Sequence, residues 1–236
     1  MQLLIIFQKV ILNTMAKGGK QMYKLAILDL DGTILDTIGD LDSALNHTLE
    51  TFSLPCITTE KTRSLVGRGL RNLVKDASGS TDEGMISKMH SEMVSYYTAH
   101  SMERTVPYPH IPEALHSLKE SEVRLAVLSN KKDEVTVALC EHFFPGIFDL
   151  CQGEKAGVPI KPSPESVLSV IERLGCSPED TVYVGDSEVD ITTAANAGID
   201  SIIVTWGFRK KEDLEKAGAK VLADDVITMK DLILNS

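Results

Sequence analysis

The hydrophobic positions of the chain form short apolar runs separated by amphipathic segments. The clearest run lies within Tyr23–Leu30 and is continuously apolar over Leu25–Leu28, a pattern typical of a strand buried on both faces. Further strands are predicted at Val123–Ser129, Ile147–Cys151, Thr181–Gly185 and Ser201–Thr205, and a weaker one at Lys220–Ala223. Helical patterns separate the later strands at Lys132–Phe144, Ser163–Leu174 and Asp190–Ala197. This alternation predicts an α/β fold, with a Rossmann-like parallel sheet and helices on both faces.

The interval between the first two predicted strands, from about residue 36 to about residue 122, is far longer than a crossover needs. It carries helical patterns at Leu41–Phe52, Glu60–Val66, Leu70–Asp76 and Glu83–His100. A structureless loop of this length is not expected inside a domain. We therefore predict a helical cap at residues 37–108, inserted after the first strand, and an α/β core at residues 22–36 and 109–236.

Residues 1–21 are expected to form an N-terminal extension that is peripheral or disordered. The apolar run Leu3–Phe7 is broken at once by Gln8 and Lys9, so it is too short for a membrane span.

The overall charge limits the partners that the chain can bind. Its formal net charge is -10 at pH 7, which opposes broad contact with nucleic acid or an anionic membrane. The four cysteines form no C-x-x-C pair, as expected for reduced thiols in a cytoplasmic protein. A small anionic substrate can bind only where a metal ion or a lysine supplies local positive charge. The sequence does not distinguish a monomer from a homodimer.

The strongest chemical signal follows the first predicted strand, where Asp29-Leu30-Asp31-Gly32-Thr33 places two carboxylates at a strand end. In open α/β sheets, sites form beyond the carboxyl ends of the strands. Two neighbouring carboxylates repel each other unless a cation or a shared proton intervenes. A solvated Asp-Gly turn is the alternative interpretation of this segment alone.

Three later segments end in residues of matching chemistry. Ser129 and Asn130 follow another strand, and Lys161 stands before a helix. Asp186 and Asp190 follow a third strand and share one face if that stretch is helical. Each residue also has a structural alternative: Ser129 or Asp190 as a helix cap, and Lys161 as a solvated charge.

With these four motifs in order, the chain resembles the haloacid dehalogenase-like superfamily of aspartate-nucleophile phosphotransferases, from about Tyr23 to its C-terminus. The resemblance implies that Asp29 attacks phosphorus, and that Asp31 protonates the leaving oxygen and later accepts a proton from water. It implies that Lys161 neutralises charge on the transferred group.

The same resemblance implies a Mg²⁺ cofactor. Asp29, the backbone carbonyl of Asp31, and Asp186 would bind the ion, while Asp190 would order these ligands from behind. It also implies a phosphate-binding set formed by Gly32, Ser129, Asn130 and Lys161.

The predicted cap contains a segment, Val66-Gly67-Arg68-Gly69-Leu70-Arg71, that resembles the substrate-facing segment of phosphoglycolate phosphatase-like members. Arg68 or Arg71 is a candidate to bind a substrate carboxylate, with exposed arginines at a helix start as the alternative. The resemblance implies a small-molecule phosphate ester as substrate, with phosphoglycolate the first choice.

Three other functions stay open on sequence. A sugar phosphomutase of the beta-phosphoglucomutase type would use the same aspartyl-phosphate, and an inorganic pyrophosphatase is a related hydrolase. A non-catalytic binding protein on this fold is the third, although such a protein has no need to keep Asp29, Asp31, Lys161 and Asp186 together. Haloacid dehalogenases and phosphonate-cleaving relatives lack an acid at the position of Asp31, so the presence of Asp31 argues against both of these activities.

Overall fold

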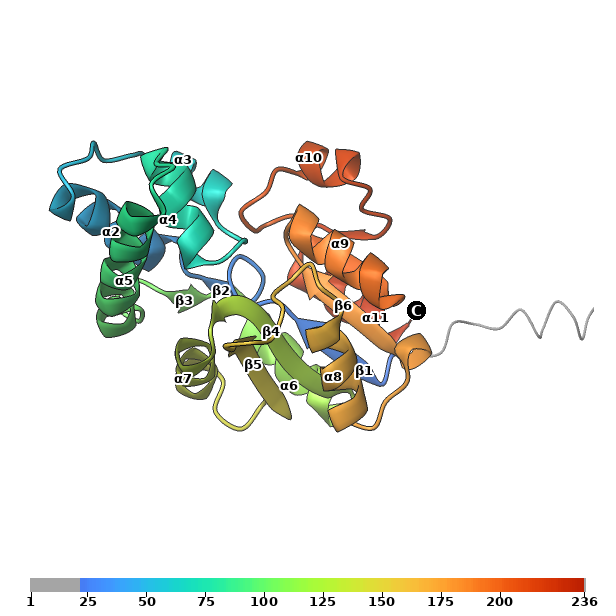
Figure 1. The fold of residues 1–236 in the computed structure, drawn as a ribbon. Coiled ribbons are helices and arrows are strands. Elements are labelled where there is room, and N and C mark those ends of the chain that lie inside the picture. Colours follow the sequence, from blue (N-terminus) through green and yellow to red (C-terminus); the bar gives the residue numbers. More distant parts are fainter. Residues whose placement is uncertain (1–21, 236) are drawn as a thin grey trace, which may run out of the picture.

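The computed structural model describes residues 22–235, and its central feature is a six-stranded sheet in which every neighbouring pair is parallel (Figure 1). The strand order is β5-β4-β1-β6-β7-β8. The strands are β1 Leu25–Leu28, β4 Arg124–Lys132, β5 Leu150–Glu154, β6 Thr181–Gly185, β7 Asp200–Val204 and β8 Leu222–Ala223. The predicted α/β fold is confirmed, and β4 runs three residues beyond its predicted end. The prediction for residues 1–21 lies outside the described residues.

Alternate residues of the strands face two different helical layers. Leu25 and Ile27 belong to a core cluster with residues of α8 and α9, whereas Ala26 and Leu28 belong to the larger cluster on the other face. The first layer contains α8 (Glu165–Arg173) and α9 (Glu188–Ala197). The second contains α6 (Ile111–Glu120), α7 (Asp133–Phe143) and α11 (Val226–Leu234) (Figure 1). Burial on both faces explains why β1 is an unbroken apolar run.

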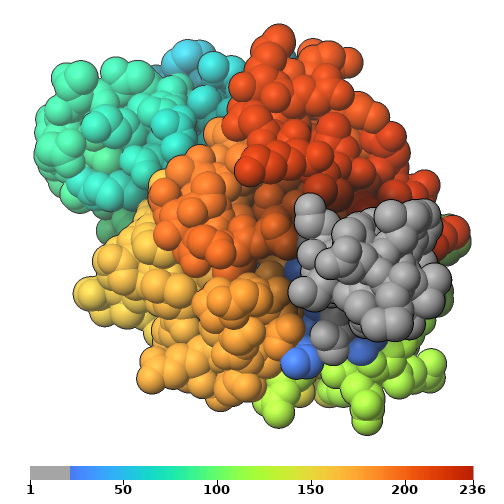
Figure 2. All heavy atoms as spheres, turned by 90° about the vertical axis from the view of Figure 1, so that its right-hand side faces the viewer, coloured from blue at the N-terminus to red at the C-terminus, as the bar shows by residue number. Residues whose placement is uncertain are grey.

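Four helices between β1 and β4 form a separate layer, which we call the cap. They are α2 (Ile38–Thr51), α3 (Thr59–Leu65), α4 (Leu70–Ser78) and α5 (Glu83–His100). Their packing on one another makes a lobe beside the C-terminal part of the chain (Figure 2). The predicted helical insert after the first strand is therefore confirmed, and its exact division from the core at residues 37 and 108 stays a prediction.

The two connections of the cap lie side by side. The chain leaves the core through β2 (Leu35–Asp36) and returns through β3 (Val106–Pro107), and these strands pair antiparallel. The buried carboxylate of Asp40, in the first turn of α2, accepts hydrogen bonds from the backbone N–H of Arg104 and Thr105 and from the Thr105 hydroxyl. These three hydrogen bonds satisfy the buried carboxylate. They also join the start of the cap, at α2, to its end, just before β3.

Because all six strands of the sheet are parallel, their carboxyl ends share one edge, on the side of the cap (Figure 1). Within residues 22–235, no helix combines the length and the apolar character needed to cross a bilayer.

Candidate active site

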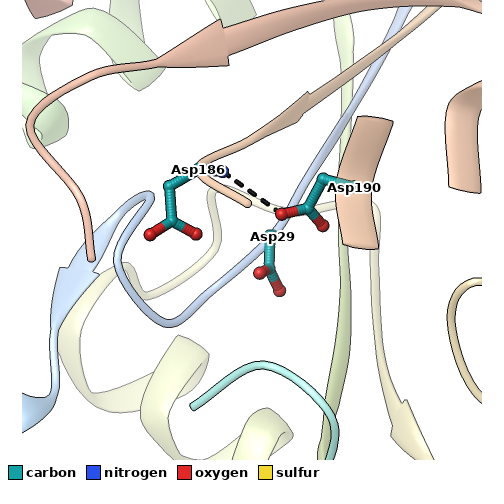
Figure 3. Close-up of side chains that lie close together, drawn as sticks. All are labelled: Asp29, Asp186 and Asp190. Carbon is teal, nitrogen blue, oxygen red and sulfur yellow. Dashed lines mark hydrogen bonds between the residues drawn. The ribbon is translucent and has the colours of Figure 1, made fainter. Parts of the chain in front are cut away.

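Asp29 follows β1 directly and is buried at the edge of the sheet that faces the cap. Its backbone N–H donates to the carbonyl of Val184 in β6, with 2.8 Å between the atoms. This pairing brings Asp29 beside the end of β6, where Asp186 follows. One carboxylate oxygen each of Asp29, Asp186 and Asp190 lies within 4.8 Å of the others (Figure 3).

Both carboxylate oxygens of Asp190 accept hydrogen bonds from the protein. One of its oxygens accepts from the backbone N–H of Asp186 (Figure 3). The same oxygen accepts from the backbone N–H and the hydroxyl of Ser187. Its other oxygen accepts from Lys161 Nζ at 2.8 Å. Ser187, not Asp190, is the N-cap of α9, because the helix begins at Glu188 and Asp190 returns to Ser187 in a capping box. The geometry places Asp190 where it orders the loop after β6.

Lys161 connects two of the three acids. Its side chain is buried, and Nζ lies 2.9 Å from Asp29 Oδ1 and 2.8 Å from Asp190 Oδ1. Burial alone lowers the pKa of a lysine, but the charges of Asp190 and Asp29 raise that of Lys161 well above its usual 10.5. Lys161 is therefore a permanent cation, and its interpretation as a solvated loop charge is wrong.

The acids are held in a state that favours a bound cation. Burial raises the pKa of Asp29 from 3.8 to about 7; Lys161 opposes this rise, and Asp190 and Asp31 add to it. Burial, followed by the charges of Asp190 and Asp29, raises the pKa of Asp186 well above 3.8. One lysine thus leaves the negative charge of the cluster only partly compensated.

Two segments that are distant in the sequence, around Gly32 and around Phe208, set the position of Asp186. Its Oδ2 accepts from the backbone N–H of Phe208 at 2.6 Å. Gly32 and Gly207 pack so closely on this carboxylate that a Cβ at either residue would lie 2.3–2.4 Å from Oδ2. Gly32 also has a φ of +79°, in the region that favours glycine. These contacts explain the glycine in Asp31-Gly32-Thr33 by close approach to the cluster.

The donor set fits a hard divalent cation. Such ions take carboxylate and carbonyl oxygens as ligands, and Mg²⁺ in particular is bound by one or two carboxylates. Asp29 Oδ1 is buried and accepts no well-directed hydrogen bond. Its contact with Lys161 is an ion pair. Asp29 and Asp186 are thus the carboxylates with oxygens available for an ion, whereas those of Asp190 are occupied.

The side chain of Asp31 lies outside this group of carboxylates. Its Oδ1 accepts from the Thr37 hydroxyl at 2.6 Å and lies 3.0 Å from Lys131 Nζ. Lys131, which brings the opposite charge to Asp31, was not among the predicted site residues. The signal was present in the sequence, because Lys131 directly follows Ser129 and Asn130.

The predicted phosphate-binding residues differ in their surroundings. Ser129 and Asn130 line the cavity above Asp29, but the Asn130 amide is used by the backbone of Gly67 and Lys161. The N–H of Gly32 donates to Leu35 O. Among the four predicted residues, Ser129 and Lys161 therefore offer side-chain donors beside Asp29.

Neither Arg68 nor Arg71 lines this cavity. Arg68 pairs with Asp76 and Arg71 pairs with Glu83, and both side chains are about half exposed. The arginine that lines the cavity is Arg209, which follows the close contact at Gly207 and Phe208. Arg68 and Arg71 as carboxylate ligands remain a prediction.

The cavity lies between the cap and the edge of the sheet and encloses only about 30 Å³. That volume is room for about two water molecules. Its lining combines apolar cap residues with the acids and with the cations Lys131, Lys161 and Arg209. Residues of the cap and of the core therefore line this cavity together with Asp29.

Comparison with known proteins places this geometry in a family. Residues 26–204 match the family model described as haloacid dehalogenase-like hydrolase. The phosphoglycolate phosphatase of Agrobacterium fabrum is 35% identical over 191 residues, which cover 78% of this chain and 81% of that protein. That of Aquifex aeolicus is 33% identical over 192 residues, covering 79% and 87%. A solved structure from Lactobacillus delbrueckii subsp. bulgaricus, assigned to the phosphoglycolate phosphatases, has a TM-score of 0.86 at 35% identity and covers 92% of this chain and 100% of its own.

The chain therefore belongs to the haloacid dehalogenase-like hydrolases. Within that family its fold and its relatives make it a phosphatase, a phosphoric monoester hydrolase.

Proposed function

We propose that the protein is a Mg²⁺-dependent phosphatase that hydrolyses a small phosphate monoester through a phosphorylated Asp29. The observation that carries the proposal is the buried Asp29 carboxylate at the floor of the cavity, with Lys161 Nζ at 2.9 Å and Asp186 alongside.

In the first step a carboxylate oxygen of Asp29 attacks phosphorus while Asp31 gives a proton to the leaving oxygen. Lys161 and Ser129 stabilise the charge of the transferred group by donating hydrogen bonds to its oxygens. In the second step water attacks phosphorus, the bond between phosphorus and the Asp29 oxygen breaks to return the carboxylate, and Asp31 takes the proton from that water. Asp190 takes no direct part and keeps Lys161 and the Asp186 loop in place.

Mg²⁺ bound by Asp29, Asp186 and the Asp31 carbonyl would neutralise the nucleophile and the phosphoryl oxygens and align them for attack. The partly compensated charge of the acid cluster supports this assignment.

Phosphoglycolate is the proposed substrate. The two relatives named above carry that activity in their names, at 35% and 33% identity. The confined cavity supports a small leaving group, and its cations support an anionic one.

Phosphate release from a panel of phosphorylated metabolites, with Mg²⁺ and with a chelator, tests the proposal. We expect phosphoglycolate to be turned over best, no turnover with chelator, and none by Asp29→Asn. Interconversion of glucose phosphates without phosphate release would instead identify a mutase, and wild-type turnover by Asp29→Asn would refute the mechanism.

A further inference from the structure

Lys131 is a buried lysine to which the proposed steps give no role. It lies in β4 just after Ser129 and Asn130, and its side chain is only 2% exposed. It lines the same cavity as Asp29 and Asp31. A buried ammonium group is costly unless it is paired and hydrogen-bonded, so its partners indicate what it does.

Lys131 has one partner in the core and one in the cap. Its Nζ lies 3.0 Å from Asp31 Oδ1 and donates to the hydroxyl of Tyr97, in α5, over a distance of 2.5 Å. The ammonium also lies 4.3 Å from the centre of the Tyr97 ring. Burial raises the pKa of Tyr97 to about 12, so this hydroxyl is neutral at ordinary pH. Among residues 22–235, Asp31 is the acid that compensates the charge of Lys131.

These contacts fix one oxygen of Asp31 and leave the other available. Oδ1 receives both the Thr37 hydroxyl and the Lys131 ammonium. No donor in the described part of the chain is hydrogen-bonded to Oδ2, and Asp31 lines the cavity. A proton can therefore pass between Oδ2 and a group in the cavity while Oδ1 holds the carboxyl group in one orientation.

We propose that Lys131, held in place by Tyr97, is a positioning residue that orients Asp31 for proton transfer to the leaving group. The proposal rests on the phosphatase function proposed above. As the bond from Asp29 to phosphorus forms, the bond from phosphorus to the leaving oxygen breaks and its electron pair stays on that oxygen. The oxygen takes the proton of Asp31, and the carboxylate left behind faces the ammonium of Lys131.

The role predicts a dependence on the leaving group. An alkoxide leaves poorly unless it is protonated, so alkyl phosphates need a well-oriented Asp31. A nitrophenolate leaves without a proton, so the hydrolysis of para-nitrophenyl phosphate does not need a well-oriented Asp31. A defect that is only structural lowers both rates alike.

The experiment compares Lys131→Met and Tyr97→Phe with wild type on phosphoglycolate, ethyl phosphate and para-nitrophenyl phosphate, with Mg²⁺ present. For Lys131→Met we expect kcat/KM on both alkyl esters to fall about 100-fold, and by less than about threefold on the aryl ester, since general acid catalysis is worth at least that much. Tyr97→Phe, which keeps the lysine and removes only one hydroxyl, should show the same pattern with a loss of about tenfold.

Neighbouring residues supply matched controls. Lys132→Met removes an exposed lysine beside Lys131, and Tyr96→Phe removes a hydroxyl beside Tyr97 on the same helix. Both should leave all three rates unchanged. In the background of Asp31→Asn, adding Lys131→Met should cost no further activity on the alkyl esters, because a residue that acts through Asp31 has nothing left to orient.

Equal losses on alkyl and aryl esters in both variants, or an additive loss in the double variant, would overturn the proposal. A loss confined to phosphoglycolate, with ethyl phosphate unaffected, would overturn it in favour of direct binding of the substrate carboxylate. If the wild type hydrolysed none of the three esters, the phosphatase function itself would fail, and this result is distinct from the other two.

Discussion

Asp29→Asn removes a buried carboxylate while keeping its shape, and we expect the metal-free variant to be inactive but more stable than wild type. In wild type, the pKa of Asp29 is 3.8 in the unfolded chain and about 7 in the folded one, chiefly because of burial. The difference of about 3 units corresponds to about 4 kcal/mol at 1.36 kcal/mol per unit.

The sign of this effect follows from the direction of the shift. The folded state holds the Asp29 proton to a higher pH than the unfolded state does. Stability from this group is therefore full below about pH 4, is lost as the pH rises, and is gone above about pH 7. Asparagine does not titrate, so the variant escapes this loss.

Urea unfolding of both proteins in chelator, at several pH values, measures the effect. The free energy of unfolding of Asp29→Asn minus that of wild type should grow by about 4 kcal/mol between pH 4 and pH 8. Changes shared by the two proteins cancel in this difference. Adding Mg²⁺ at pH 8 should reduce it, because the ion stabilises the ionised wild-type site. A difference that stays flat with pH, or falls, would refute the description of Asp29 as a buried, undercompensated acid.

Three further substitutions have defined outcomes. Lys161→Met should abolish phosphate release and lower the free energy of unfolding in chelator by about 3 kcal/mol, because it leaves buried Asp190 without its cation. Gly32→Ala should weaken Mg²⁺ binding, measured by calorimetry, because the new Cβ would lie 2.3 Å from Asp186 Oδ2; unchanged affinity would contradict this. Arg209→Ala removes two hydrogen bonds to cap carbonyls at the end of α3, so KM should rise about tenfold with a smaller change in kcat; an unchanged KM would show that the contact is dispensable.

Elements marked by a continuous apolar run or by apolar residues at helical spacing were predictable from the sequence. The predicted strand Thr181–Gly185 and the predicted helix Glu83–His100 have the observed ends. The strands β2 and β3 were missed, because two residues carry no periodicity and their pairing forms only when the chain returns from the cap. Helix α6 was missed because Pro107, Pro109 and Pro112 lie close together at its start, although Pro112 sits in its first turn, where proline is tolerated.

The candidate site likewise contains residues that were predictable from the sequence and contacts that were not. Asp29 and Asp186 were predictable because both follow strands, and the ends of parallel strands meet at one edge. Contacts that cross between distant segments were not, such as Phe208 N–H on Asp186 or Tyr97 on Lys131. No sequence spacing relates these pairs. The ion pair of Arg68 with Asp76 was not predicted either.

The stereochemical course at phosphorus tests the central claim most directly. A phosphorothioate analogue of phosphoglycolate, made chiral at phosphorus with two oxygen isotopes, would be hydrolysed in water of the third isotope. Transfer to Asp29 and then to water is two in-line displacements, each of which inverts phosphorus. We predict net retention of configuration. Net inversion would mean that water attacks the ester directly, and would contradict a covalent phosphoryl group on Asp29.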